Sequence, residues 1–442
     1  MTRKVILITI CLVVLLAGCG QAAPQAPAAT SAPAAQAPTA APAAPDGAIS
    51  FMVFGDPAEK AAYATLVDAF KQRNPQIDVQ LVHIPAQGDY LTRLGADFAA
   101  GTPADIILVN YRRFAGFAVK GALEPLGPYL AKSSVVSEGD FYQEAIKAFY
   151  WNGTLTCIPQ NVSSLVVYYN KNLFDQAGVA YPQAGWSWDD FLKAAQALTK
   201  DTNGDGATDQ YGVGTELEAI RLAPFVWQNG GEIVDDPAKP TRLALDTPAA
   251  TEAFQWFVDL QVKHHVAPDA TQDQAEDSES RFMNGRLGML LNSRRGVPTY
   301  REIKGFEWDV GPLPQGKQPV TILHSDAYCM TAASKNKPAA WAFVEFANSA
   351  EGQTIIAKTG RTVPSLKAVA NSPAFLDSNS LPKSSQVFLD VIPHIRSLPT
   401  MAAWADIEEV LTEELQRAFY GQAPVSEAIS AAATNSAPFF SR

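Results

Sequence analysis

The apolar run Asp105-Ile106-Ile107-Leu108-Val109 ends a regular alternation of strands and helices near the start of the chain. An uninterrupted run of this kind is typical of a strand covered on both faces. Two earlier segments, Ile49 to Phe54 and Ile77 to Val82, also have strand character. Between them a helix is predicted from Pro57 to Arg73, because four apolar residues recur on one of its faces: Tyr63, Leu66, Val67 and Phe70.

A second helix is predicted from about Asp89, as N-cap, to Gly101. The resulting β-α-β-α-β order predicts a doubly wound α/β lobe. Ligands of such sheets bind beyond the carboxyl ends of the strands. Those ends are followed here by Phe54-Gly55-Asp56 and Asn110-Tyr111-Arg112, although each segment could equally be a loop that only turns the chain.

Later helices are predicted from their caps and apolar faces. Ser187 has the position of an N-cap, and Asp190 three residues on completes the pattern of a capping box. Pro248 is predicted at the first position of another helix. Trp404 to Tyr420 is predicted as a late amphipathic helix.

The N-terminus has the features of a lipoprotein signal. Arg3 and Lys4 precede the apolar run Val5 to Leu16, as in a secretory signal peptide. The following Leu16-Ala17-Gly18-Cys19 resembles the bacterial lipobox, which predicts removal of residues 1–18 and lipidation of Cys19. An ordinary signal peptide and an uncut anchor are the alternatives, but the apolar run is shorter than the ~20 residues of a spanning helix.

Residues 19–47 are rich in Ala and Pro and lack large apolar side chains, so they are predicted to be an extended tether. A lipid at one end of a tether predicts an extracytoplasmic body, held at the outer face of the cell membrane or in the periplasm. Loss of Arg3 and Lys4 would change the formal net charge from −11 to −13. This acidic balance argues against nucleic acid as a partner.

After loss of Cys11 and lipidation of Cys19, two cysteines remain, Cys157 and Cys329. In an oxidising compartment such a pair is either a disulfide or two separate buried thiols.

An aspartate-rich loop follows at residues 201–209. Asp201, Asn203, Asp205 and Asp209 alternate with other residues, and glycine stands at the sixth position, as in the first part of an EF-hand calcium loop. The twelfth position is Gly212, where a bidentate glutamate is expected. Either Glu216, Glu218 or another element completes a calcium site, or the loop is a polar turn without metal.

Motifs of catalysis are not evident. The chain has no His-Glu-x-x-His or Gly-x-Ser-x-Gly pattern, and the adjacent His264 and His265 cannot share one helix face as zinc ligands. We therefore expect no enzyme activity and no required cofactor. A glycoside hydrolase needs only two carboxylates, so it remains an alternative.

Taken together, the motifs of the body resemble those of family 1 extracellular solute-binding proteins, the maltose-binding-protein-like receptors of ABC importers. The resemblance rests on their order along the chain: Val167-Tyr168-Tyr169-Asn170-Lys171, Gly185-Trp186-Ser187-Trp188-Asp189, Asp209-Gln210-Tyr211-Gly212, Asn229-Gly230-Gly231, Phe282-Met283-Asn284-Gly285 and Trp308-Asp309-Val310-Gly311-Pro312-Leu313-Pro314.

This resemblance implies a two-lobed α/β periplasmic-binding-protein-like fold of type II. Its lobes are joined by a hinge of crossing strands and close over a ligand cleft. The implied N-terminal lobe comprises residues 48–158 and 325–380, and the C-terminal lobe residues 159–324 and 381–442. Crossings are implied near Pro159-Gln160, near Leu323-His324 and near residue 380. Cys157 and Cys329 would then lie on neighbouring strands, which implies a disulfide.

The resemblance also implies a monomer that captures a sugar or oligosaccharide and delivers it to the transmembrane subunits of an ABC permease. Aromatic platforms, amides, carboxylates and arginines suit a pyranose ring and its hydroxyl groups. The predicted ligand-binding residues are Asp56, Asn110, Tyr168, Trp227, Arg294, Asp326 and Arg361.

Other ligands and functions remain as alternatives. Where the family often has a glycine-tryptophan pair, this chain has Ser293-Arg294-Arg295, and two guanidinium groups also suit a phosphorylated or carboxylated solute. A surface glycoside hydrolase and a structural or adhesive lipoprotein are further hypotheses.

Overall fold

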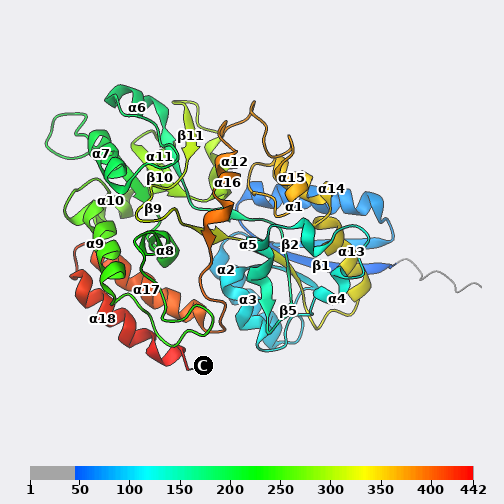
Figure 1. The fold of residues 1–442 in the computed structure, drawn as a ribbon. Coiled ribbons are helices and arrows are strands. Elements are labelled where there is room, and N and C mark those ends of the chain that lie inside the picture. The colour runs from blue at the N-terminus through cyan, green and yellow to red at the C-terminus, as the bar shows by residue number, and fades with distance from the viewer. Residues whose placement is uncertain (1–44, 442) are drawn as a thin grey trace, which may run out of the picture. The chain divides into compact units, whose positions relative to one another are not determined.

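The computed structural model describes residues 45–441. The predicted signal peptide, the lipidation site Cys19 and nearly all of the predicted tether lie outside these residues. Within residues 45–441, no helix combines the length and apolar character that crossing a bilayer requires. Figure 1 shows two lobes of mixed helices and strands in this part of the chain.

The first sheet contains five strands in the order β2-β1-β3-β13-β6. Their bounds are β1 (Gly47–Phe54), β2 (Ile77–Ile84), β3 (Ile106–Asn110), β6 (Ile158–Pro159) and β13 (Asp326–Met330). Strand β1 pairs in parallel with β2 and β3, whereas β13 is antiparallel to β3 and β6. The predicted β-α-β-α-β order is therefore confirmed, and it is completed by a strand from far along the chain.

Helix α1 spans Pro57–Arg73, as predicted. Helix α2 spans Gln87–Ala99, so the prediction of Asp89 as its N-cap is wrong. The N-cap is Ala86, whose carbonyl accepts from the backbone N–H of Tyr90 at 2.9 Å. Asp89 lies in the first turn, where its charge is favourable beside the helix N-terminus.

The second sheet has the order β11-β8-β10-β9. It comprises β8 (Val166–Asn170), β9 (Tyr211–Thr215), β10 (Leu287–Asn292) and β11 (Trp308–Gly311). Strand β10 runs parallel to β9 and antiparallel to β8. Nearly every residue of these strands is buried, because helices cover the sheet.

The predicted capping box at Ser187 is confirmed. The Ser187 hydroxyl accepts from the backbone N–H of Asp190 at 3.1 Å, and the Asp190 carboxylate accepts from the backbone N–H of Ser187 at 3.0 Å. Helix α7 (Trp188–Leu198) accordingly begins directly after Ser187. The helix predicted at Pro248 is α9 (Pro248–Val262), and the late amphipathic helix is α17 (Trp404–Phe419).

A small sheet has three strands in the order β14-β12-β7, of which β7 and β12 fall on the two segments of chain that connect the larger sheets. Its members are β7 (Ser163–Ser164), β12 (Thr321–His324) and β14 (Ile395–Arg396). The chain therefore leaves the first sheet after Pro159 and re-enters it at Asp326, two residues after β12 ends.

The remaining elements cover the sheets or connect them. They are α3 (Tyr111–Ala118), α4 (Gly127–Leu130), α5 (Gln143–Ile146), α6 (Lys171–Ala177), α7 (Trp188–Leu198), α8 (Ala219–Gln228), α10 (Ala270–Ala275), α11 (Ser278–Met283), α12 (Val297–Tyr300), α13 (Lys337–Ala347), α14 (Ala350–Lys358), α15 (Lys367–Ala370), α16 (Val387–Asp390), α18 (Val425–Ser436), β4 (Tyr150–Trp151) and β5 (Thr154–Leu155), with short 3-10 turns at Glu138–Asp140, Lys147–Phe149, Arg294–Gly296, Ile392–His394 and Ala437–Phe439.

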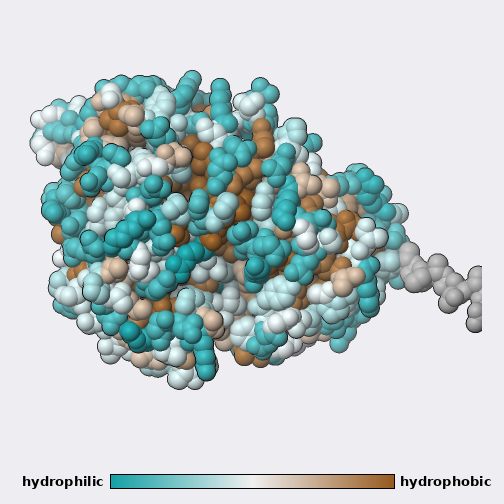
Figure 2. Space-filling model, in the orientation of Figure 1, coloured by the Kyte–Doolittle hydropathy of each residue, from teal (hydrophilic) through white to brown (hydrophobic). Residues whose placement is uncertain are grey.

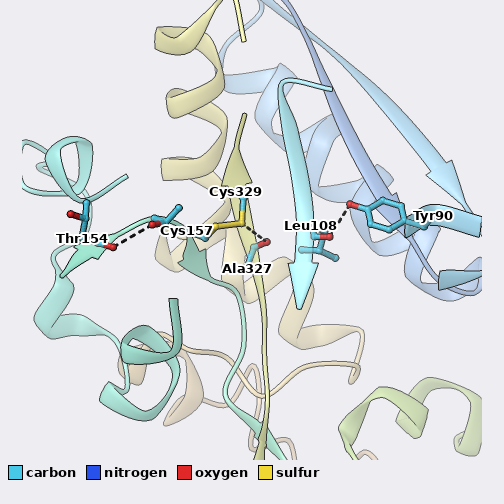
Figure 3. The surroundings of a disulfide bond; sticks show 7 residues. Tyr90, Leu108, Thr154, Cys157, Ala327 and Cys329 are labelled. Atoms are coloured by element: carbon cyan, nitrogen blue, oxygen red, sulfur yellow. Dashed lines mark hydrogen bonds between the residues drawn. A yellow bond between two sulfur atoms is a disulfide. The ribbon is translucent and has the colours of Figure 1, made fainter. Parts of the chain in front are cut away.

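A disulfide joins Cys157 to Cys329, with the two sulfur atoms 1.99 Å apart and the two Cα atoms 4.6 Å apart (Figure 3). Cys329 lies on β13 and Cys157 directly precedes β6, so the bond fastens the edge strand β6 to its neighbour. Nearby, the Tyr90 hydroxyl donates to the Leu108 carbonyl at 2.8 Å and ties α2 to β3. On the face shown in Figure 2 the surface is mainly hydrophilic, and hydrophobic residues show chiefly in the middle of the view.

Candidate functional site: a charged cavity between the two sheets

A cavity of about 830 Å³ opens where the carboxyl ends of β1 and β3 meet residues that follow β9 and β10. Its lining from the first sheet includes Asp56, Asn110 and Asp326, and its lining from the second includes Glu216 and Arg295. Both segments that the strand ends predicted, 54–56 and 110–112, contribute to the lining. The cavity is within the usual size of a small-molecule site.

The turn after β1 requires glycine. Gly55 has φ +121°, and a Cβ added there would lie 1.5 Å from the Glu59 carboxylate. This close approach lets α1 begin directly at the cavity, with Asp56 as N-cap accepting from the backbone N–H of Glu59 at 2.8 Å. The other carboxylate oxygen of Asp56 accepts from Arg361 Nη1 at 3.1 Å, so Asp56 connects α1 to the loop at residue 361.

Glu59 is a buried carboxyl group in the cavity wall. Burial raises its pKa to about 7; the guanidinium of Arg361, its ion-pair partner, opposes this rise, whereas the carboxylate of Asp326 adds to it. The Glu59 carboxyl group therefore changes its protonation state near neutral pH.

Asn110 and Asp326 face each other across the register of β3 and β13. Asn110 Nδ2 donates to Asp326 Oδ1 at 3.0 Å, and Asn110 Oδ1 accepts from the backbone N–H of Arg112 as N-cap of α3. Burial raises the pKa of Asp326, while the hydrogen bond from Asn110 opposes the rise. The pair presents an amide and a carboxyl group side by side at the cavity.

On the opposite side, Glu216 accepts from two arginines, Arg221 at 2.5 Å and Arg295. Burial alone would raise the pKa of Glu216, but the two guanidinium charges outweigh it and lower the pKa to about 2. This carboxylate is therefore ionised throughout the physiological range.

His324 ends β12, between the two sides of the cavity. Arg221 Nη1 lies 2.9 Å from His324 Nε2, and because a guanidinium only donates, this ring nitrogen accepts. Burial first, and then Arg221 and Arg112, hold the pKa of His324 well below its usual range. The ring is neutral, and its proton is on Nδ1.

Four of the seven predicted ligand-binding residues line the cavity: Asp56, Asn110, Asp326 and Arg361. The other three, Tyr168, Trp227 and Arg294, are not part of its lining. The structure thus does not place them where the sequence predicted, because the side chain of each is buried against other residues of the protein.

The Tyr168 side chain is fully buried and donates from its hydroxyl to the Ser293 carbonyl at 2.8 Å. Trp227, on α8, packs its ring against the guanidinium of Arg396 at 4.6 Å. Arg294 is only 1% exposed and donates to the Gly360 carbonyl and the Ser385 hydroxyl. Aromatic residues on buried strands and helices pack far more often than they bind, and periodicity alone does not separate the two roles.

Residues outside the seven predicted ligand-binding positions contribute most of the charge of the lining: Glu59, Arg112, Arg113, Glu216, Glu218, Arg221, Arg295, Glu408 and Glu409. Arg112 adjoins a predicted strand end and had a detectable signal. Glu408 had none, because it lies on α17 and reaches the cavity only through tertiary packing.

Among the described lining residues the aromatic side chains are Phe54 and Phe117. The tyrosine and tryptophan platforms expected from the sequence therefore do not face this cavity. The surface that a solute would meet combines charged and hydrogen-bonding groups with apolar carbon atoms.

The aspartate-rich loop keeps its hydrogen bonds within itself. Asp201 accepts from the backbone N–H groups of Gly204 and Gly206, and Asp209 accepts from Thr202 and Asn203. In the described part of the chain no group of three or more His, Cys, Asp or Glu side chains is arranged to hold a metal ion. Glu216 pairs with arginines in the cavity instead of completing the loop. Calcium binding stays a prediction.

Comparisons with known proteins agree with this architecture. The model of the family described as bacterial extracellular solute-binding protein matches residues 55–354. A binding protein of Brucella abortus is 26% identical over 361 residues, which cover 80% of this chain and 84% of that protein. The sn-glycerol-3-phosphate-binding periplasmic protein UgpB of Agrobacterium fabrum is 27% identical over 256 residues, which cover 54% of this chain and 56% of that protein.

Solved structures share the fold over nearly the whole described chain. The ABC substrate-binding protein Lmo0181 of Listeria monocytogenes, in complex with cycloalternan, has a TM-score of 0.81 at 25% identity and covers 88% of this chain and 98% of that one. The GacH receptor of Streptomyces glaucescens has a TM-score of 0.78 at 22% identity, over 90% of this chain and 99% of that one. With its two-lobed α/β fold and the family match over most of its length, the chain belongs to the bacterial extracellular solute-binding proteins.

Proposed function

We propose that this protein is the lipid-anchored receptor of an ABC importer, which captures a sugar or oligosaccharide between its lobes and delivers it to a membrane permease. The observation that carries the proposal is the cavity of about 830 Å³, to which both sheets contribute charged side chains. A solute that contacts both sides stabilises a closed arrangement of the lobes, and a permease can recognise that arrangement.

The balance of charge in the lining favours a neutral, hydroxyl-rich solute. Seven carboxyl groups and five guanidinium groups line the cavity, and each of these arginines already pairs with a carboxylate. Sugar hydroxyls both donate and accept, so they can bind to carboxylates and guanidinium groups without disrupting these pairs. The similarity to structures named for complexes with cycloalternan and acarbose also supports a carbohydrate.

A phosphorylated solute is the second candidate. The arginines of the lining and the similarity to a glycerol-3-phosphate-binding protein favour it. An anion would, however, have to displace carboxylates from their arginines, and it would meet Glu218 and Glu409 as further like charges. We therefore rank it second.

A mass spectrum of the ligand released from protein purified without refolding would test the choice. We expect a neutral oligosaccharide, and titration of the emptied protein with that compound should change tryptophan fluorescence. Asp326→Asn should weaken binding by about tenfold, because a hydrogen bond to a charged group is lost. The matched change Asp205→Asn, in the exposed loop, should leave affinity unchanged. Release of a phosphorylated compound, or turnover of the sugar by clean protein, would reject the proposal.

Anchoring is tested separately. We propose that Cys19 carries the lipid and that the protein works as a monomer at the outer face of the cell membrane. Cys19→Ser should release the protein from the membrane fraction and abolish labelling by radioactive palmitate, while solute affinity is unchanged.

Widely exposed large hydrophobic side chains in residues 45–441 are limited to Val119, Val135 and Val262, which supports the monomer; light scattering would reveal a dimer.

A further inference from the structure

We propose that a second cavity, separate from the solute cavity, binds an oxyanion of phosphate chemistry. It has a volume of about 570 Å³, and its basic lining residues are Arg294, Arg301 and Lys358. Arg294 follows β10, Arg301 follows α12, and Lys358 is the last residue of α14. Ser372 and Ser380 contribute hydroxyl groups from the segment that precedes α16. This site does not depend on the identity of the transported solute.

The proposal depends mainly on the burial and the neighbours of Arg294. In the described part of the chain three arginines are less than 9% exposed: Arg221, Arg281 and Arg294. Arg221 pairs with Glu216 at 2.5 Å and Arg281 with Glu276 at 3.5 Å, but among residues 45–441 no carboxylate lies within 4 Å of the Arg294 guanidinium. A buried charge without a counter-charge is costly, and proteins normally pair it.

The groups that the Arg294 guanidinium contacts directly are uncharged. Its Nε donates to the Gly360 carbonyl at 2.9 Å and its Nη1 to the Ser385 hydroxyl at 3.1 Å. The guanidinium also lies 4.3 Å from the ring centre of Phe375 and 4.9 Å from that of Phe388. Burial, with the charge of Arg301 adding to it, lowers the pKa of Arg294 to about 9, which is the direction expected of an uncompensated cation.

Arg301 converges on the same turn. Its Nε donates to the Leu381 carbonyl at 2.7 Å and its Nη1 to the Thr359 carbonyl at 3.2 Å. A Cβ added at Gly360, where φ is +86°, would lie 2.4 Å from Arg301 Nη1, so glycine is what lets the guanidinium approach. Within the described part of the chain Arg301 also has no ion pair within 4 Å, and its pKa is lowered, mainly by burial.

The lining of the second cavity has a net positive charge. Arg294, Arg301 and Lys358 supply three positive charges, and the carboxyl group of the lining is that of Asp377. The carbonyl groups at the end of α14 add at most about half a negative charge. A net charge of about +1.5 remains, in a chain whose formal net charge is −11. A phosphate carries a negative charge of about this size at neutral pH, so it can neutralise the cavity, and it offers oxygens to several donors at once.

The two cavities share a wall and have different linings. Arg295 lines the solute cavity, whereas its neighbour Arg294 lines the second cavity. Likewise Arg361 lines the solute cavity, and Lys358, three residues earlier, lines the second. Arg295→Gln therefore serves as the control for Arg301→Gln and Lys358→Gln, because it makes the same change of charge in the other cavity.

The test is thermal unfolding and isothermal titration with inorganic phosphate, against sodium chloride at equal ionic strength. We expect phosphate to raise the melting temperature of the wild-type protein beyond the effect of chloride. Arg301→Gln and Lys358→Gln should each weaken phosphate binding by about tenfold, as expected for loss of a charge-assisted contact. Arg295→Gln should retain phosphate affinity within about twofold.

Two outcomes would overturn the proposal. In the first, phosphate has no effect on the wild-type protein beyond that of chloride. In the second, Arg295→Gln loses phosphate binding while Lys358→Gln keeps it, which would place the anion in the solute cavity. Lys358 is exposed, so Lys358→Gln is expected to fold. This variant therefore tests the site even if Arg301→Gln does not fold. The sugar affinity of the same variants separates this result from the proposed transport function.

Discussion

Arg113 Nη2 lies 3.1 Å from Glu408 Oε2, an ion pair that joins helix α3, next to the first sheet, to the late helix α17. The same carboxylate pairs with Arg112. The Glu408 side chain is 4% exposed and that of Arg112 is 13% exposed, so both charges are largely removed from water. One glutamate thus connects two segments nearly three hundred residues apart at the edge of the solute cavity.

Removal of the Glu408 carboxylate should destabilise the folded protein. Glu408→Gln leaves two arginines without their shared partner, and we expect the free energy of unfolding to fall by about 3 kcal/mol. Urea denaturation followed by tryptophan fluorescence would measure it. Glu409→Gln, the same change at the exposed neighbouring position, should cost less than about 0.5 kcal/mol. Equal losses in both variants would show that the pairs of Glu408 do not stabilise the protein.

Stability should depend on pH through Glu59. Its pKa is raised from 4.5 to about 7, chiefly by burial, so the folded protein holds this proton more tightly than the unfolded chain does. The stabilising contribution is present below about pH 4.5 and is lost as pH rises through about 7, by at most about 3 kcal/mol. Glu59→Gln should flatten the fall in unfolding free energy between pH 5 and pH 8, and an unchanged slope would contradict this assignment. Asp326, whose pKa is also raised by burial, should maintain a residual slope of the same sign.

The disulfide should stabilise the fold through the unfolded state. Cys157 and Cys329 are 172 residues apart in sequence, so the bond closes a long loop and restricts the unfolded chain. The double variant Cys157→Ala/Cys329→Ala should lose about 2–5 kcal/mol of unfolding free energy. Reduction of the wild-type protein before denaturation should give a similar loss, and a double variant as stable as the oxidised protein would contradict the prediction.

A substitution of Trp227 would test whether this residue stabilises the fold or binds the solute. Its ring is 2% exposed and packs against Arg396, which is itself held by Glu232 at 2.7 Å. Trp227→Phe should lower the melting temperature but leave solute affinity within about twofold once the protein is folded. Isothermal titration at a temperature well below unfolding would measure this. A loss of affinity as large as that of Asp326→Asn would return Trp227 to the binding site.

Much of the architecture could be predicted from local pattern. The continuous apolar run of β3, the one-sided apolar face of α1 and the Ser187 capping box all depend on residues within a few positions of one another, and all three predictions are confirmed. The N-cap of α2 was predicted wrongly because Asp89 is suited both to a cap and to the first turn, and sequence pattern does not separate these two positions.

The site was predictable only in part. Asn110 ends β3 and Asp56 lies two residues after β1, and parallel strands bring their carboxyl ends to one edge, so local sequence located them. Glu408 and Arg221 carry no such signal, because their positions at the cavity depend on how helices from distant segments pack. Arg294 and Arg295 are adjacent and chemically identical, and no local pattern distinguishes the one that lines the solute cavity.

The sequence by itself determined the kind of protein: alternating strands and helices, their caps, and the segments that end at the binding edge of a sheet. These are properties of neighbouring residues, since backbone geometry and hydrophobic periodicity act over a few positions. Only the tertiary structure decided which charges meet and which side chains a solute can reach. Burial and pairing are properties of residues brought together by packing, and they set both the proton affinity of Glu59 and the separation of Arg294 from the solute cavity.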